Sequence, residues 1–454
     1  MFRTTIAGLV GAVLVLSASC SKKDEAPAAE AEEKVELVSK AELDGLEQRR
    51  RAEGEKNRSK KCPRPLLRGE PLPGRADEDI LALLVPSDKA LLECLAKVAV
   101  HTDGISDYLA APTADPPLDI IEVLVACNTL PQAVSRAVRH EDSCSPFLAG
   151  RRGMTRMITL LRFGKAAALL AIDAAKKGDF DSAFDISVDF LVLGQDVSRG
   201  GGPLIAGMVG VAAVSAVVQG GLRNVLNETA GIPAQALDRL AHEMTRLIET
   251  EPSFGSFLAY ERHGNALQMI MLDLKGRGWT PPGGFDDDFD AKAYFDGRQE
   301  GKTMEGLDMR QQLGLAWIAT EHSMTALQRA CPPGLDAEPC HKAMRTVAME
   351  KANRAAEGQW SRALQVMLKK DPGPEIRQWI IDILQGVGTP AFSKYVPRYS
   401  LREFYYRAVR LHVELVAARQ KDHKCPAPEE LKSGRWKELA VGESGAFFPV
   451  SRLK

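Results

Sequence analysis

Helical periodicity is the feature that most constrains the fold of this chain. From Asp77 onward, apolar residues recur at intervals of three and four, as in Ile80, Leu83 and Leu84. That spacing places them on one face of a helix, whereas a half-buried strand needs strict alternation. The only strand candidate is the segment 446–450. We therefore predict an all-α protein, either a multi-helix bundle or an irregular array of helical hairpins, with at most a short β segment at the C-terminus.

The clearest helical pattern lies between residues 154 and 226. One helix is expected to end near Lys177-Gly178, because basic residues followed by glycine favour a helix C-terminus, and Asp179 can cap the next helix. The Gly-Asp-Phe turn followed by Ala183 resembles one unit of a tetratricopeptide repeat. Neighbouring units at a period of about 34 residues are not evident. We favour a generic αα-hairpin, with the repeat unit as the alternative.

A run of 23 residues, 200–222, carries no charge. Its length and apolar character permit a transmembrane helix. Glycine-rich ends shorten the convincing part to 203–218, and a helix buried on all sides of a bundle has the same composition. We therefore expect 203–218 to be buried core, with a membrane-inserted helix as the alternative.

The N-terminus carries the pattern of an export signal. Arg3 precedes an apolar run from Ile6 to Leu16, and the small residues 17–19 lead to Cys20. A positive start, a short apolar region and a small-residue exit are typical of a secretory signal. The run is too short to span a bilayer, which takes about 20 residues. The segment resembles the signal peptide of bacterial lipoproteins, although Leu16 stands one place further from the cysteine than is usual.

This resemblance implies that the chain is cleaved after Ser19 and that Cys20 is lipidated. Several buried acyl chains, at about 0.8 kcal/mol per CH₂, make a firm membrane anchor. The resemblance also implies a location in the bacterial cell envelope. The outer membrane is favoured over the inner one, because Ser21 stands where an aspartate would signal retention. The alternative is an ordinary secretory signal with an incidental cysteine.

Shifts in composition divide the rest of the chain. After the signal peptide 1–19, residues 20–61 carry many charges of both signs and few bulky apolar side chains. Such a segment buries too little surface to offset its ordering entropy, so we predict a flexible or helical tether that begins with the lipidated cysteine. A Gly-, Pro- and Asp-rich loop at 276–303 is expected to separate a first helical half, 62–275, from a second, 304–454.

Seven cysteines remain if Cys20 is lipidated, and export makes disulfides permissible. Because the chain has no Cys-x-x-Cys motif, structural bridges are favoured over redox or metal chemistry. Sequence alone does not fix connectivity. The pairs that loop lengths favour are Cys331 with Cys340, Cys127 with Cys144, and Cys62 with Cys94, which leaves Cys425 odd.

The sequence contains no motif that marks a catalytic centre. It has no Walker loop, no dinucleotide-binding glycine pattern and no Gly-x-Ser-x-Gly elbow. The helix pattern at His242 lacks the second histidine of a zinc protease, because Arg246 stands there. We therefore name no catalytic residue and no cofactor. Asp286, Asp288 and Asp290 are a candidate calcium site, with a solvated acidic loop as the simpler interpretation.

Charge balance bears on the class of partner. Of 454 residues, 59 are Lys or Arg and 60 are Asp or Glu, so the net charge of -1 gives no field that would draw nucleic acid. The signal and the helical hairpins favour a lipid-anchored, non-enzymatic scaffold or binding module, with the membrane and an envelope protein as partners. The alternatives are an α-helical enzyme with a dispersed carboxylate and histidine site, and a small-ligand or lipid carrier with a cavity around 204–218.

Overall fold

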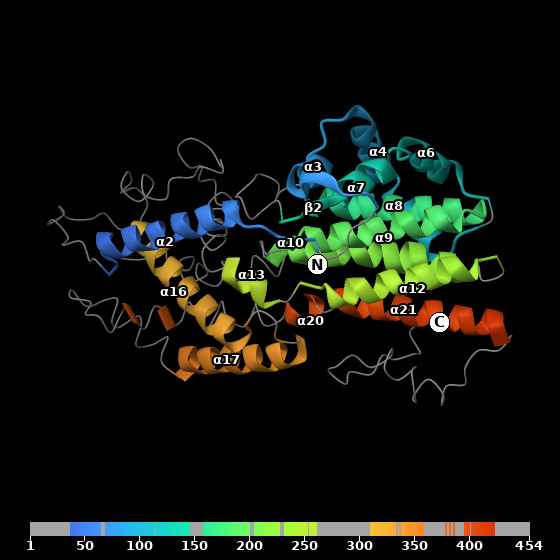
Figure 1. Ribbon diagram of the computed structural model, residues 1–454. Coiled ribbons are helices and arrows are strands. Elements are labelled where there is room, and N and C mark those ends of the chain that lie inside the picture. Colours follow the sequence, from blue (N-terminus) through green and yellow to red (C-terminus); the bar gives the residue numbers. More distant parts are fainter. Residues whose placement is uncertain are drawn as a thin grey trace, which may run out of the picture. The chain divides into compact units, whose positions relative to one another are not determined.

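The computed structural model confirms the all-α prediction (Figure 1). Helices dominate the described residues, and the strands among them are two short ones, β1 (Leu72–Arg75) and β2 (His140–Asp142). The β segment predicted at 446–450 and the loop predicted at 276–303 lie outside the described residues. The structure describes residues 37–64, 69–113, 115–145, 158–199, 204–227, 231–252, 254–260, 309–332, 335, 337–357, 377–378, 381–382, 385, 395–399 and 401–422.

The chain forms two compact units, and both are discontinuous in sequence. Unit 1 comprises Met1–Ser59 and Phe254–Val396, and unit 2 comprises Lys60–Ser253 and Pro397–Lys454. This division differs from the predicted contiguous halves, because the last described helix, α21 (Leu401–Asp422), packs against α12 in unit 2. The face a helix buries depends on which other helix fits it, and order along the chain does not reveal that.

Unit 2 contains the two strands and most of the described helices (Figure 1). The short α20 (Val396–Tyr399) spans the boundary between the units in the sequence. Before α21, the helices of unit 2 are α3 (Ala76–Leu84), α4 (Lys89–Val100), α5 (Thr102–Ala110), α6 (Leu118–Ala126), α7 (Leu130–Ala137), α8 (Ile158–Lys176), α9 (Phe180–Asp196), α10 (Leu204–Ser215), the π-helical η4 (Ala216–Leu222), α11 (Arg223–Asn227) and α12 (Ala234–Glu249).

The α8–α9 hairpin forms as predicted. Gly178 adopts a φ of 80°, which a glycine reaches without steric cost, and this ends α8. The Asp179 carboxylate accepts a hydrogen bond from the backbone N–H of Ser182 at 3.0 Å and caps α9. Hydrogen bonds from Ser182 lower the pKa of Asp179. The αα-hairpin is therefore confirmed, and its likeness to a tetratricopeptide unit stays a prediction.

The uncharged run lies in the core of unit 2. By length and composition one described helical run, Ala206–Asn227, could cross a membrane, and 67% of its apolar window is buried inside the protein. Helices α6 and α7 are long and apolar enough to cross a membrane only if they are taken together as one span with a 45° bend. Small residues let α10 approach its neighbours, since a Cβ on Gly210 would lie 2.6 Å from the Gly194 carbonyl of α9. This close packing leaves no room for a ligand between α9 and α10 at that point, which weighs against the cavity predicted around 204–218.

The two strands are a structural feature that the sequence did not predict. They pair in parallel, with Leu72 opposite His140 and Arg75 opposite Asp142. Neither segment alternates in hydrophobicity, so the period-2 signal is missing. Their pairing arises from contacts between segments about 68 residues apart in sequence, which local patterns do not encode.

All six cysteines expected in disulfides are paired, but two of the three predicted pairings are wrong. The structure confirms Cys331–Cys340, and replaces the other pairs by Cys62–Cys144 and Cys94–Cys127. Helices α4 and α6 pack side by side, which brings Cys94 and Cys127 to a Cα separation of 4.6 Å. The Cys62 carbonyl accepts a backbone hydrogen bond from Ser143 at 3.0 Å, next to Cys144. Cys425 lies outside the described residues.

Unit 1 contains α2 (Lys40–Ser59), α13 (Gly255–Tyr260), α16 (Met309–Ala330) and α17 (Ala337–Glu357). Helix α2 lies inside the predicted tether and begins with a capping box, because Glu42 accepts from the Ser39 backbone N–H at 3.0 Å and Ser39 Oγ accepts from the Glu42 N–H at 3.3 Å. Leu43 and Val38 pack near Gly314 of α16. The Cys331–Cys340 disulfide ties the end of α16 to the first turn of α17. These contacts set three helices around a shared polar cleft.

Candidate ligand-binding cleft

The described residues of unit 1 line an open polar cleft of about 770 Å³. This volume lies within the range of about 300–1,000 Å³ that is typical of ligand pockets. The cleft is lined by charged and amide side chains together with one histidine, and no Phe, Tyr or Trp is among its described lining residues. These are Arg49, Glu321, His322, Thr325, Ala326, Arg329, Lys351, Gln378, Asp382 and Gln385.

Helical spacing explains why α16 supplies half of the lining. Glu321, Thr325 and Arg329 recur at intervals of four, so they share one face of the helix. Met324 and Leu327, on other positions of the same turns, are fully buried. The same rule applies to Gln378, Asp382 and Gln385, which are four and three residues apart. One polar stripe on each segment therefore faces the cleft, while the apolar residues of α16 form the core of unit 1.

Several charges of the cleft already have partners. Arg49 of α2 donates to the Glu321 carboxylate at 3.1 Å, and Gln378 donates to the Asp382 carboxylate at 3.0 Å. Beside the cleft, Arg377 pairs with Glu42. Burial tends to raise the pKa of Glu42, but hydrogen bonds from Ser39 and the charge of Arg377 outweigh it and lower the pKa. These carboxylates are therefore occupied by groups of the protein itself.

Three other polar groups of the cleft have no partner among the described residues. The Arg329 guanidinium, on the exposed rim, and the half-buried Lys351 ammonium make no ion pair or hydrogen bond there. The Gln385 side chain is 1% exposed, and its Oε1 accepts no hydrogen bond. A buried acceptor left unsatisfied costs about 1–3 kcal/mol, and groups of this kind are uncommon in native proteins. The cleft therefore offers the two cations to a molecule that enters it, whereas the Gln385 acceptor is covered by protein atoms.

The surroundings of His322 favour its neutral form. Desolvation lowers its pKa, and the charges of Lys351 and Arg377 lower it further, against the raising effect of Glu321. A neutral imidazole presents one donor and one acceptor. The structure places His322 beside carboxylates that other side chains occupy.

A second charged cluster, in unit 2, is fully buried and lies at the C-terminal end of α9. Arg402 is 0% exposed and donates to the Glu251 carboxylate at 2.7 Å, to the Gly194 carbonyl at 2.6 Å and to Ser198 Oγ at 3.0 Å. It also donates to the Tyr399 hydroxyl at 2.6 Å. Burial lowers the pKa of Arg402 but the Glu251 charge raises it, and the net shift is upward. This cluster ties α21 to α9, and the protein's own groups occupy the Arg402 guanidinium, so we assign it a structural role.

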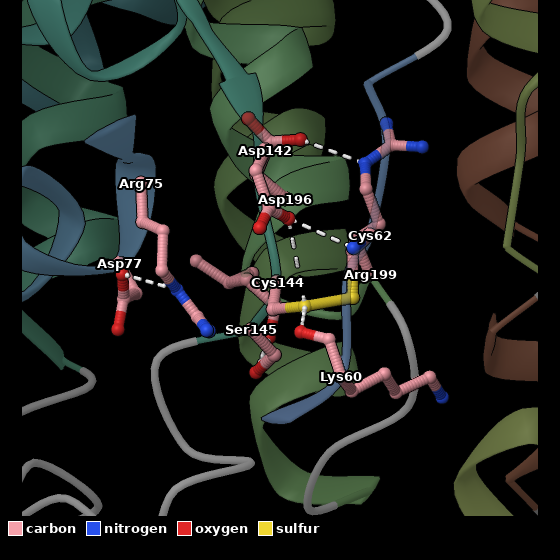
Figure 2. The surroundings of a disulfide bond; sticks show 10 residues. Lys60, Cys62, Arg75, Asp77, Asp142, Cys144, Ser145, Asp196 and Arg199 are labelled. Carbon is pink, nitrogen blue, oxygen red and sulfur yellow. Dashed lines mark hydrogen bonds and ion pairs between the residues drawn. A yellow bond between two sulfur atoms is a disulfide. The ribbon is translucent and has the colours of Figure 1, made fainter. Parts of the chain in front are cut away.

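The same end of α9 fixes residues 60–64, the first described residues of unit 2, which we call the N-terminal arm. Figure 2 shows Asp196 and Arg199 beside the Cys62–Cys144 disulfide. Asp196 accepts from Arg199 Nε at 3.0 Å and pairs with the buried Arg64 of the arm. The arm is thus held by one covalent bond and one buried ion pair.

The atoms nearest this disulfide resemble a metal-ligand set. Potential ligand atoms of Cys62, Asp142 and Cys144 lie within 4.8 Å of one another. The two sulfur atoms are bonded to each other, and Asp142 accepts from the Cys62 backbone N–H at 2.8 Å (Figure 2). Disulfide sulfurs are not thiolates, which are the form that binds metal. We therefore interpret this cluster as part of the arm's attachment.

The remaining predicted site residues lie outside the described part of the chain. These are the lipidation candidate Cys20 and the calcium candidates Asp286, Asp288 and Asp290. Sequence analysis did not predict the cleft, since its lining comes from segments that are far apart in the chain. The available signal was the polar stripe along α16, and that stripe is equally typical of a solvated helix face.

The chain matches no protein-family model, no curated protein and no solved structure.

Proposed function

We propose that this chain is a lipid-anchored binding protein of the bacterial cell envelope, and that the cleft of unit 1 binds its ligand. The observation that carries the binding role is the open cleft of about 770 Å³, in which the cations Arg329 and Lys351 have no partner among the described residues. An anionic ligand that enters the cleft would pair with these cations through charge-assisted hydrogen bonds.

The envelope location is supported by the N-terminal sequence and by the disulfides. The signal ends at Cys20, and Ser21 follows it, which favours the outer membrane. Three disulfides fit a chain that matures in an oxidising compartment. Lipidation would attach the binding unit to the membrane through its own N-terminal segment.

Metabolic labelling tests the anchor. Cells that express the full chain are grown with an alkyne-palmitate analogue, and the purified protein is assayed for label and for its membrane fraction. We expect label and membrane recovery for the wild type, and loss of both for Cys20→Ala. Cys425→Ala is the matched control, since it also removes a cysteine that no described residue pairs with. An unlabelled wild-type protein that remains soluble would refute the anchor.

Equilibrium dialysis tests the binding role. Detergent-solubilised full-length protein is dialysed against a small-molecule extract of the cell envelope, and retained compounds are identified by mass spectrometry. We expect at least one compound that the wild type retains and that Lys351→Gln loses. Lys342→Gln, an exposed change on the same helix, is the control. Equal retention by all three proteins would contradict a ligand site in the cleft.

An enzymatic role is the second candidate, favoured by one observation. His322, whose pKa is lowered, lies in the cleft with Glu321 and Asp382, and a dispersed set of histidine and carboxylates is the kind of site that the enzyme alternative requires. A neutral imidazole can act as a general base. If His322→Ala abolishes turnover of a retained compound while its retention persists, the site is catalytic. If the compound is recovered unchanged from the wild type, binding is the function.

The predicted envelope partner has one candidate surface among the described residues. Leu118, Ile121 and Val125 are exposed on one face of α6, and Leu92 of neighbouring α4 is exposed as well. Exposed apolar groups that gather on one face are typical of contact surfaces. Co-purification from solubilised envelopes, with Leu118→Ser/Val125→Ser beside wild type, tests this assignment. Equal recovery of partners by both proteins would remove it.

A further inference from the structure

We infer that anion binding at Lys351 in the unit 1 cleft is linked to proton uptake by His322, so that the cleft binds anions more tightly at mildly acidic pH. This inference rests on the proposed binding role of the cleft and adds the regulation of that site by pH. It follows from the places of the two side chains in the hairpin of α16 and α17 and from the charges around them.

The hairpin brings His322 and Lys351 to similar levels of the same cleft. The Cys331–Cys340 disulfide joins the two helices, which pack against each other. His322 lies nine residues before Cys331, and Lys351 lies eleven residues after Cys340. At about 1.5 Å per residue, each is about 13–17 Å along its helix from the joined end. Both side chains line the cleft, where His322 is exposed and Lys351 is half-buried, so small ions can reach both.

The charge of Lys351 acts on the His322 ring. Desolvation lowers the pKa of His322, and the charge of Glu321 raises it. The charges of Lys351 and Arg377 lower this pKa, and that of Asp382 raises it. Because like charges oppose each other, the Lys351 ammonium disfavours the imidazolium form. An anion bound to Lys351 would offset that positive charge and would thereby favour protonation of His322.

The other charges around His322 already have partners in the protein. The pairs are Glu321 with Arg49, Arg377 with Glu42, and Asp382 with Gln378. Arg329 also lines the cleft, but it lies two residues before Cys331, near the joined end of the hairpin. Among the described residues, Lys351 is therefore the cation at the level of His322 that is left for an anion.

Thermodynamic linkage makes this effect reciprocal. If a bound anion favours the imidazolium form, protonation strengthens anion binding by the same factor. The affinity therefore rises as the pH falls through the pKa of His322 in the anion-bound protein, and it levels off below the pKa in the free protein. Coupling between partly exposed charges is small, so we expect the affinity to change about threefold.

Histidine NMR with sulfate as the probe anion tests the inference on the detergent-solubilised full-length chain. The histidine rings are labelled with ¹³C, and the His322 resonance is assigned with His322→Gln. Its titration midpoint is recorded in sodium sulfate and in sodium chloride at equal ionic strength. Sulfate keeps its charge in this range of pH, so a difference arises in the protein. We expect the midpoint to be about half a pH unit higher in sulfate, which corresponds to the threefold change in affinity.

Two variants separate the linkage from a general salt effect. In Lys351→Gln the difference between sulfate and chloride should disappear, and the His322 midpoint in chloride should be higher than in wild type because a positive charge is gone. Lys342→Gln, an exposed change on the same helix, should leave the difference unchanged. His341 of α17 is not among the described lining residues, and its midpoint should be the same in both salts. Circular dichroism of each variant checks that the helices are retained.

Two results overturn the linkage. They are equal His322 midpoints in the two salts, and a difference that persists in Lys351→Gln. A sulfate titration of the His322 resonance at constant pH separates this failure from failure of the proposed function. If the resonance shifts saturably and Lys351→Gln abolishes the shift, but the midpoints are equal, the cleft binds anions without proton linkage. If sulfate causes no saturable shift at any pH, the cleft does not bind this anion and both proposals are wrong.

Discussion

Removal of the buried Arg402 tests the structural cluster at the end of α9. The guanidinium donates to Glu251, Gly194, Ser198 and Tyr399, and all of it is buried. In an Arg402→Met variant the Glu251 carboxylate loses its charge partner, and breaking a buried pair in this way costs about 3–5 kcal/mol. Since domains are stable by about 5–15 kcal/mol, the loss is about a fifth or more of the free energy of unfolding.

The assay must report on unit 2 alone, because the two units need not unfold together. Urea titration followed by hydrogen-exchange mass spectrometry of peptides from α9 and α21 gives that resolution. Arg407→Met is the matched control on the same helix, since its pair with Glu403 is partly exposed and is worth about 0.3–0.5 kcal/mol. A double variant, Arg402→Met with Glu251→Met, should recover much of the loss because no unpaired charge remains. A loss below about 1 kcal/mol for Arg402→Met would refute the reasoning.

Three further predictions concern a covalent bond, a titrating group and a packing contact. Replacing Cys62 and Cys144 by serine removes a disulfide between residues 82 apart in sequence. The loss of this loop constraint on the unfolded chain should lower the stability of unit 2 by about 4.5 kcal/mol, measured by urea titration. A loss below about 1 kcal/mol would contradict the loop-entropy argument. Burial lowers the pKa of His412 to about 4, so the unfolded chain takes up a proton at a higher pH than the folded one, and stability should fall as the pH drops from about 6.5 to 4. NMR titration should find this pKa in the folded protein, and His412→Gln should remove that part of the pH dependence. A native pKa at or above 6.5 would be inconsistent with the argument. Gly210→Ala should cost about 1–3 kcal/mol by thermal unfolding because its Cβ meets the neighbouring helix at 2.6 Å, whereas Gly45→Ala, with its nearest contact at 3.7 Å, should be neutral or stabilising.

What the sequence by itself determined is local. Apolar residues at intervals of three and four predicted the helices, because one helical turn brings such residues onto one face. The Gly178-Asp179 turn predicted the α8–α9 hairpin, since a positive φ and a carboxylate cap act within a few residues. The uncharged run 203–218 predicted a helix without a polar face, and such a helix is stable in the core of unit 2. The short loop between Cys331 and Cys340 allowed one disulfide to be paired correctly.

Only the tertiary structure decided which distant segments meet. Cys62 bonds to Cys144 and Cys94 to Cys127, because a strand pairing and a helix packing bring them together. Helix α21 joins unit 2 for the same reason. The cleft collects single residues from α2, α16, α17 and the segment 378–385, and each of these residues alone has the pattern of an ordinary solvated position. Periodicity records which face of a helix is buried, but contacts between faces depend on the fit of side chains that are hundreds of residues apart, and no local pattern carries that information.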